Sequence, residues 1–299
     1  MYRSQNMAKT ANKNFTDSDI FPICVPSYNR PHPKIVDCAD ERLPLVFFVR
    51  REQLDEYRYL REKFRVVPID GVSNIGETRA KVLKWAWVKG YSNIFMLDDD
   101  IQQVDYLYPF TLESGNECMR ANTLNTGKKG SYLDPTAFKI WMLWLERLDP
   151  DVAISSPSYR PDSWHMKKAG ADMMYNSGAC IQCIHLNVEL LHEYNIRYES
   201  SDVVGNEDYA LQFHIMDKGL KSCILTDLVY NCPPINQNAG GCQGASGYSD
   251  SIARYKKYIK LFKSNVSGKA HPGVLTKQTR TGFESIKFNW KYWRDQLSE

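Results

Sequence analysis

Ile94-Phe-Met-Leu-Asp-Asp-Asp-Ile101 is the stretch that decides the fold of this 299-residue chain. The four apolar residues are typical of a short buried strand, and three aspartates follow them at once. Like charges this close raise one another's pKa unless a cation relieves the repulsion. Hard carboxylate oxygens suit Mg²⁺ or Mn²⁺, which bind through one or two carboxylates together with substrate phosphates. An acidic loop at a strand end is the alternative interpretation.

The positions of the aspartates predict on which side of the strand each side chain lies. Side chains alternate along a strand, so Asp98 and Asp100 are expected on one side and Asp99 on the other. We therefore expect Asp98 and Asp100 to be the metal ligands. The metal interpretation is favoured because an apolar strand brings the acids to the edge of a sheet where α/β proteins form their sites.

Upstream, apolar runs alternate with helical patterns. Strands are expected at Ile20–Val25, Leu43–Val49 and Phe64–Ile69, and helices at 52–63 and 77–89. This order predicts βαβ units in an α/β fold, a Rossmann-like and mostly parallel sheet with helices on both faces. Ligands of such sheets bind beyond the carboxyl ends of the strands. Downstream, further helices are expected at 135–148, 187–194 and 206–218, with strands at 151–155, near Cys180 and at 222–225.

Composition and charge divide the chain into three parts. We expect a polar N-terminal tail (1–18), a catalytic domain (19–247) and a basic, aromatic-rich C-terminal helical appendage (248–299). Residues 251–299 hold eleven Lys/Arg and three Asp/Glu, which gives this segment a formal charge of +8. The net charge of the whole chain is +3, so the remaining residues together carry −5. Such asymmetry indicates either a polyanionic partner or a solvated helix over the core. The basic face recurs at helical spacing through Lys256, Lys257, Lys260 and Lys263.

Two segments at the starts of expected helices contain candidate functional residues. In Ser73–Arg79, Asn74 or Ser73 can cap a helix, Gly76 lets the backbone approach a phosphate, and Arg79 can pair with a phosphate or carboxylate. A capped helix with an exposed arginine would look the same. Glu207 and Asp208 open another helix, where acids are favoured in any case, but one of them could take a proton from an acceptor hydroxyl.

No apolar run is long enough for a membrane helix, and the first residues hold no block of signal-peptide type, so no membrane partner is expected. Without such a block, the eight scattered cysteines are interpreted as reduced thiols. We expect a soluble cytoplasmic protein.

Taken in order, four segments resemble the nucleotide-sugar glycosyltransferases of the A-type (GT-A) fold. Val25-Pro-Ser-Tyr-Asn-Arg30 is similar to their first nucleotide-binding strand and loop, and Asn74-Ile-Gly-Glu-Thr-Arg-Ala80 to their Gly-x-x-x-Arg helix start. Leu97-Asp-Asp-Asp-Ile101 resembles their Asp-x-Asp metal motif, and Asn206-Glu-Asp208 their acidic pair. Among these enzymes the chain most resembles the phage-encoded TET-associated glycosyltransferases. The likeness is dense from about 21 to 101, patchy to 230 and absent over the basic C-terminus.

This resemblance implies a metal-dependent transfer of sugar from a UDP-sugar to a hydroxyl, with Mn²⁺ or Mg²⁺ as cofactor. Direct attack would make the transfer inverting, and a retaining route, which needs a different set of residues, stays open. It implies Asp208 as the base, Glu207 as its orienting neighbour, and a hydroxymethylated pyrimidine in DNA, such as 5-hydroxymethylcytosine, as acceptor in the host cytoplasm. Many A-type enzymes add a late histidine to the metal shell. His271 is a candidate by position only, and the loop 236–238 offers other oxygens. The residues expected to contact the donor are Pro26, Ser27, Arg30, Arg50, Asn74, Gly76, Arg79, Asp98 and Asp99.

Two other functions stay open. A nucleotidyltransferase also joins an α/β nucleotide fold to acidic metal ligands, but it should carry a Gly- and Lys-rich phosphate loop, and the loop Pro26–Pro31 contains no glycine. A non-catalytic nucleic-acid-binding protein on a degenerate glycosyltransferase fold is the second alternative. The presence of Asp98, Asp100 and Asp208 counts against it.

Overall fold

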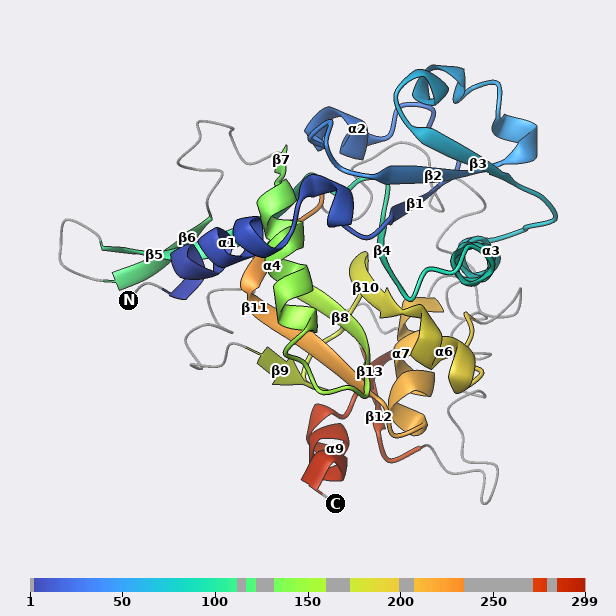
Figure 1. The fold of residues 1–299 in the computed structure, drawn as a ribbon. Helices are drawn as coiled ribbons and strands as arrows, with labels where there is room; N and C mark the ends of the chain where they lie inside the picture. The colour runs from blue at the N-terminus through green and yellow to red at the C-terminus, as the bar shows by residue number, and fades with distance from the viewer. Residues whose placement is uncertain are drawn as a thin grey trace.

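A computed structural model describes residues 3–111, 117–121, 132–159, 173–198, 207–233, 271–278 and 284–298. One sheet of eleven strands forms the centre of this part of the chain (Figure 1). Its order is β3-β2-β1-β4-β10-β8-β11-β5-β6, with β7 beside β5 and β9 beside β11. The strands are β1 Ile23–Ser27, β2 Leu45–Arg50, β3 Arg65–Ile69, β4 Asn93–Leu97, β5 Gln103–Thr111, β6 Glu117–Ala121, β7 Tyr132–Leu133, β8 Val152–Tyr159, β9 Met173–Tyr175, β10 Cys183–Asn187 and β11 Lys221–Asn231.

Most of the central strands run in one direction. β3, β2, β1 and β4 pair in parallel, and β10 lies antiparallel between β4 and β8. β8 therefore runs with β4, and β11 pairs with β8 in parallel. The register places Ser27 beside Val49 and Arg50 beside Ile69, so β1, β2 and β3 end together. The mostly parallel α/β sheet predicted from the sequence is confirmed, and the edge where β1 to β4 end is called the carboxyl edge.

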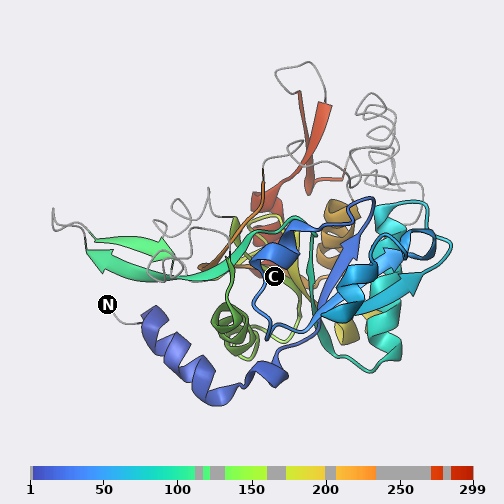
Figure 2. The same cartoon turned by 90° about the horizontal axis from the view of Figure 1, so that it is seen from above.

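Helices cover both faces of the sheet. On one face, α1 (Arg3–Asn14), α2 (Lys34–Cys38) and α4 (Pro135–Leu145) enclose a core that includes the fully buried Phe95 and Trp141. On the other face, α3 (Ile75–Val88), α6 (Val188–Glu193) and one side of α7 (Glu207–Asp217) bury a second core. Figure 2 shows α1 and α4 side by side, away from α3, while the β5–β6 hairpin extends from the body of the molecule.

Polar residues begin the main helices. Asn74 caps α3 by accepting a hydrogen bond from the Glu77 N–H, and Asp134 caps α4, whose first residue is proline. Asn187 caps α6 in the same way. These caps explain why the helices begin within two residues of the expected positions. No helix in the described ranges is long and apolar enough to cross a membrane.

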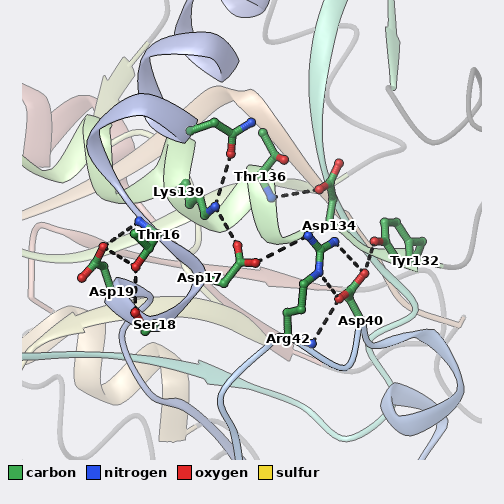
Figure 3. Close-up of polar contacts among 11 residues, drawn as sticks. Thr16, Asp17, Ser18, Asp19, Asp40, Arg42, Tyr132, Asp134, Thr136 and Lys139 are labelled. Atoms are coloured by element: carbon green, nitrogen blue, oxygen red, sulfur yellow. Dashed lines mark hydrogen bonds and ion pairs between the residues drawn. The ribbon is translucent and has the colours of Figure 1, made fainter.

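The N-terminal segment differs from the expected polar tail. α1 packs along α4, and Met7, Ala8 and Ala11 are buried in the main core. A polar network beside it holds the connection to the rest of the domain (Figure 3). In this network Lys139 Nζ lies 2.6 Å from Asp17 and 3.3 Å from Asn12 Oδ1. One methionine and two alanines at helical spacing are enough to make this otherwise polar segment part of the core.

Two other expectations are corrected. The segment 52–63 forms two short 3₁₀ helices, Arg51–Gln53 and Arg58–Glu62, instead of one α-helix. Between them Tyr57 is fully buried, and its hydroxyl accepts a hydrogen bond from the Arg30 N–H, so tertiary contacts override helical propensity. The described end of the C-terminal segment is a hairpin, β12 (Val274–Gln278) with β13 (Glu284–Phe288), followed by the short helix α9 (Trp290–Asp295). Trp293 of α9 packs against Phe213 of α7, so this end is not wholly helical.

Candidate active site at the carboxyl edge

The aspartates that follow β4 form a turn. The strand ends at Leu97, the Asp98 N–H donates to the Gln182 carbonyl at 2.7 Å, and the Ile101 N–H donates to the Asp98 carbonyl at 3.2 Å. Strand alternation therefore does not govern the three side chains. Asp98 pairs with Arg79, whereas Asp99 and Asp100 both face Arg30. The expected grouping of Asp98 with Asp100 on one side is replaced by this division.

The Arg30 cluster consists of Arg30, Ser27, Tyr57, Asp99 and Asp100. Arg30 forms an ion pair with Asp99, and its Nη1 lies 3.4 Å from Asp100 Oδ2. Ser27 Oγ donates to Asp99 Oδ2 at 2.6 Å, and Ser27 Oγ and the Tyr57 hydroxyl are 3.1 Å apart. Burial raises the pKa of Asp99 to about 7, against the opposing effect of the Arg30 charge. The cluster joins the loop after β1 to the turn after β4.

The Arg79 cluster consists of Arg79, Asp98, Glu207 and Asp208. Arg79 is 4% exposed, its Nη2 lies 2.5 Å from Asp98 Oδ1, and its Nη1 lies 2.9 Å from Glu207 Oε1. The same Nη1 forms an ion pair with Asp208. Glu207 and Asp208, which are 128 and 129 positions from Arg79 in the sequence, thus both contact its guanidinium.

Burial and charge set the protonation of this cluster. Burial lowers the pKa of Arg79, but the carboxylates of Asp98 and Glu207 outweigh it and raise this pKa above its ordinary value. Burial also raises the pKa of Asp98 to about 6, although Arg79 opposes the shift. Arg79 therefore stays charged and favours the ionised form of Asp98.

The two clusters together carry an excess of negative charge. They hold two guanidinium groups and five carboxylates, which gives a formal charge of 2 − 5 = −3 if all are ionised. Arg79 Nε is buried and has no hydrogen-bond partner among the described residues. Negative charge of this size on partly buried side chains favours the binding of a cation or a set of donors. In the described ranges, no three His, Cys, Asp or Glu side chains converge as a metal-binding group.

At the start of α3, the backbone is already engaged by the chain's own side chains. Glu77 Oε2 accepts hydrogen bonds from the Ser73 N–H at 2.6 Å and from Ser73 Oγ at 2.9 Å. The Glu77 N–H donates to Asn74 Oδ1 at 2.9 Å. Gly76 is buried in the first turn. Of the residues expected here to bind the donor, Arg79 alone belongs to the ionic cluster, and Asn74 acts as a helix cap.

The end of β2 supplies a stacked pair. The guanidinium of Arg50 lies 3.9 Å from the centroid of the Tyr28 ring. Arg50 Nε is buried and lacks a hydrogen-bond partner among the described residues. Pro26, also expected to contact the donor, is buried inside β1 opposite Phe48. Arg50 and Tyr28 thus form a cationic and aromatic surface at the carboxyl edge, next to the Arg30 loop.

The structure adds two residues that the sequence did not suggest. Gln182 has φ 62°, and besides accepting from the Asp98 N–H it accepts from Cys232 Sγ at 3.4 Å through Oε1. Burial raises the pKa of the Cys232 thiol to about 12, with added effects from the nearby Asp100 and Asp98 charges. Both residues adjoin strand ends, but only the antiparallel direction of β10 brings Gln182 to this edge. No local sequence signal could have identified it.

His271 requires a correction, because the structure does not bring it to the aspartates. Its Nε2 lies 3.6 Å from Asp217 at the end of α7, and its ring stacks on Trp293 with centroids 5.4 Å apart. Asp217 lies nine residues along α7 from Asp208, or about 13 Å at the rise of an α-helix. His271 is therefore a packing residue of the C-terminal end. Lys256, Lys257, Lys260, Lys263 and the loop 236–238 lie outside the described residues.

The sequence matches no protein-family model and no curated protein. Among solved structures, the chain is similar to S. aureus TarS 1-349 in complex with UDP-GlcNAc, with 11% identity and a TM-score of 0.46 over 81% of this chain and 65% of that one. It is also similar to GalNAc-T7 with UDP, GalNAc and Mn²⁺, with 10% identity and a TM-score of 0.39 over 71% of this chain and 44% of that one.

A third similarity is to 4-diphosphocytidyl-2C-methyl-D-erythritol synthase from Anaerococcus prevotii DSM 20548, with 9% identity and a TM-score of 0.39 over 73% of this chain and 89% of that one. The chain spans less than two thirds of the TarS fragment, 60% or 65% in two of its structures. Likeness at this level does not establish a function, which must come from the site itself.

Proposed function

We propose that this protein is a metal-dependent glycosyltransferase that moves a sugar from a nucleotide-diphosphate sugar to a hydroxyl group. The observation that carries the proposal is the Arg79 cluster. Three carboxylates from two distant segments meet at one buried guanidinium, at the sheet edge where α/β proteins bind nucleotides. Acids and a cation in one buried place suit a reaction that separates a diphosphate from a sugar.

Asp98 and Asp100 are the proposed metal ligands, one from each cluster, because the turn that joins the two clusters places them two residues apart. Their oxygens are of the kind that Mg²⁺ and Mn²⁺ prefer, and the surplus negative charge of the two clusters favours a divalent cation. An open site of two carboxylates completed by donor phosphates needs no third protein ligand. Such a metal would neutralise charge on the departing nucleoside diphosphate.

Asp208 is the proposed base and Glu207 its orienting neighbour. Both lie at the N-terminus of α7, the end of a helix where acidic side chains are stabilising. Arg79 contacts both side chains and also Asp98, so it positions the base relative to the metal ligand. Asp208 would take the proton of the acceptor hydroxyl as that oxygen attacks the sugar carbon, and direct attack inverts the configuration there.

Arg50 and Tyr28 are proposed to bind the nucleoside end of the donor. The Arg50 Nε is buried and has no hydrogen-bond partner within the described ranges, and the Tyr28 ring offers a flat surface for a base. Arg30 is proposed to hold the aspartate turn in place, because Asp99 and Asp100 already occupy its guanidinium.

The finer assignments rest on the sequence resemblance. They are a UDP-sugar as donor, Mn²⁺ or Mg²⁺ as cofactor, and a hydroxymethylated pyrimidine in DNA as acceptor. The basic C-terminal segment with Lys256, Lys257, Lys260 and Lys263 supports a polyanionic acceptor by its charge.

The test is donor hydrolysis and donor binding with and without Mn²⁺, using a set of nucleotide-sugars. Asp100→Asn should abolish turnover and remove the metal-dependent part of donor binding. Asp70→Asn is the matched control, since Asp70 is an exposed carboxylate at the same edge that pairs with Arg51 at 2.5 Å. Donor affinity that is identical with and without Mn²⁺ in the wild type would rule out the metal assignment.

A further inference from the structure

A groove lies between α3 and α6, on the face of the sheet opposite α4. Its volume is about 670 Å³, within the range of ligand-binding clefts. One wall comes from α3 and the other from α6 and the chain that follows it. No residue with a proposed catalytic or donor-binding role lines the groove, so the proposed reaction leaves it unexplained.

The charged side chains that line the groove in the described part of the chain are cationic. Lys81, Lys84 and Arg197 line it, and no carboxylate does so in the described part of the chain. Of the acids on α6, Glu189 accepts a hydrogen bond from Ser92 at 2.7 Å, and Glu193 lies outside the lining. Lys81 and Lys84 are three residues apart on a helix and therefore lie on the same side of it. An anionic ligand complements this surface.

A flat aromatic surface continues the same side of α3. Trp87 follows Lys84 by three residues, and its ring stacks on His192 with centroids 3.5 Å apart and an interplanar angle of 9°. Trp87 is nevertheless 43% exposed, and its neighbour Val88 is 70% exposed. A large ring held by a neighbour on one face and open to solvent is suited to stacking with another ring.

One buried residue is shared by the groove and the surroundings of the active site. Tyr198 lines the groove and is 3% exposed, and the Arg79 guanidinium lies 5.9 Å from its ring centroid. The Tyr198 side chain therefore separates this part of the groove from the Arg79 cluster.

We propose that this groove binds a segment of single-stranded nucleic acid, with a base on Trp87 and phosphates beside Lys81, Lys84 and Arg197. Cations beside an open ring are the combination with which proteins hold single strands. An acidic protein segment would use the cations but leave the Trp87 stacking surface without a function. The role of this strand as the sugar acceptor rests on the proposed function, whereas its binding does not.

The test is a titration of the full chain with a fluorescein-labelled oligothymidylate of about 12 nucleotides at several salt concentrations. The groove variant replaces Lys81, Lys84 and Arg197 with Gln. The control variant replaces Lys9, Lys13 and Arg61, which are exposed on other elements, with Gln and so loses the same charge. In a plot of log K against log salt, the groove variant should lose about two units of slope, from three single-strand phosphate contacts. Trp87→Leu should weaken binding roughly tenfold.

A second measurement locates the strand directly. An oligonucleotide that carries 5-bromouracil should crosslink, on irradiation, to peptides of α3 or α6. Equal weakening in the groove and control variants, or crosslinks that map only elsewhere, would overturn the inference. Tighter binding of an acidic peptide than of the oligonucleotide would overturn it in favour of a protein partner. Donor hydrolysis by the wild type is measured in parallel, and strand binding without hydrolysis supports this inference while contradicting the glycosyltransferase proposal.

Discussion

Arg30 and Arg79 both lie at the carboxyl edge with little exposed side-chain surface, and both pair with the same aspartate turn, but their other partners differ. Arg30 joins the ends of two neighbouring strands, and Ser27 and Tyr57 add hydrogen bonds to its cluster. Arg79 joins the turn to the start of α7, and one guanidinium serves three carboxylates. The side chains of the two arginines are 11% and 5% exposed, so burial does not distinguish them.

The difference lies in how well each cluster balances its charge. In the Arg30 cluster, the carboxylate of Asp99 receives both an ion pair and the Ser27 hydroxyl, as expected of a structural link. In the Arg79 cluster, acids outnumber the cation by two, and acids of a helix N-terminus meet a strand-end turn. Surplus charge in a buried place lowers stability, so it indicates a site that takes up a further cation.

The largest expected effect comes from removing either arginine. Arg79→Met and Arg30→Met should each lower the free energy of unfolding by about 3–5 kcal/mol, because each removes the cation that pairs with a buried carboxylate, Glu207 or Asp99. Mn²⁺ should restore part of the loss in Arg79→Met, where the unpaired acids can bind it, and less in Arg30→Met. Urea denaturation with and without Mn²⁺ measures this. Arg79→Lys retains a charge and serves if Arg79→Met does not fold. The same Mn²⁺ response in both clusters would remove the distinction between them.

Second in size is the effect of the proposed base. Asp208→Asn should lower kcat by roughly 10²–10⁴, as expected for a lost general base, with donor binding nearly unchanged. Asp99→Asn, in the other cluster, should act mainly through stability. Steady-state kinetics and donor titrations on both variants make the comparison. Loss of donor affinity in Asp208→Asn, equal to its loss of turnover, would instead move Asp208 to the donor site.

A smaller effect concerns a buried histidine whose pKa is lowered by burial. His185 in β10 is 2% exposed, lies 2.8 Å from Asn93 Oδ1 through Nε2, and has its pKa lowered to about 3 by burial. The unfolded chain takes up a proton near pH 6.5 and the folded chain does not, so this stability is present above pH 6.5 and is lost as the pH falls toward 3. Between pH 7 and 5 the loss should be about 2 kcal/mol.

His185→Gln separates this loss from that of other titrating groups. Urea denaturation at the two pH values should show a smaller drop in the variant than in the wild type. An equal drop in both proteins would mean that His185 is protonated in the folded state.

The smallest effect is expected at an exposed arginine of the same edge. Arg51 pairs with Asp70 at 2.5 Å, but their side chains are 58% and 63% exposed. Arg51→Met should therefore change the free energy of unfolding far less than Arg30→Met does, because solvent screens an exposed ion pair. Thermal denaturation of this variant beside Arg30→Met tests whether burial, rather than the ion pair itself, sets the cost. Comparable losses in the two variants would contradict that view.

Sequence patterns located the Arg79 cluster better than they described the Arg30 cluster. Arg79, Asp98, Glu207 and Asp208 were each singled out, because strand ends and helix starts leave local signals. The pairing of Asp99 with Ser27 was not expected, because the turn after Leu97 does not follow strand alternation. His271 was misplaced, since position along the chain says nothing about which end of α7 a residue meets.

The order of apolar runs and helical patterns determined the parallel half of the sheet, because each βαβ unit is set by local periodicity and a preferred handedness. The caps at Asn74 and Asn187 were equally local. Only the tertiary structure decided that α1 joins the core, that β10 runs antiparallel and brings Gln182 to the aspartates, and that Arg79 meets residues 128 and 129 positions away. Those contacts depend on strand order and helix packing between distant segments, which no local pattern of side chains specifies.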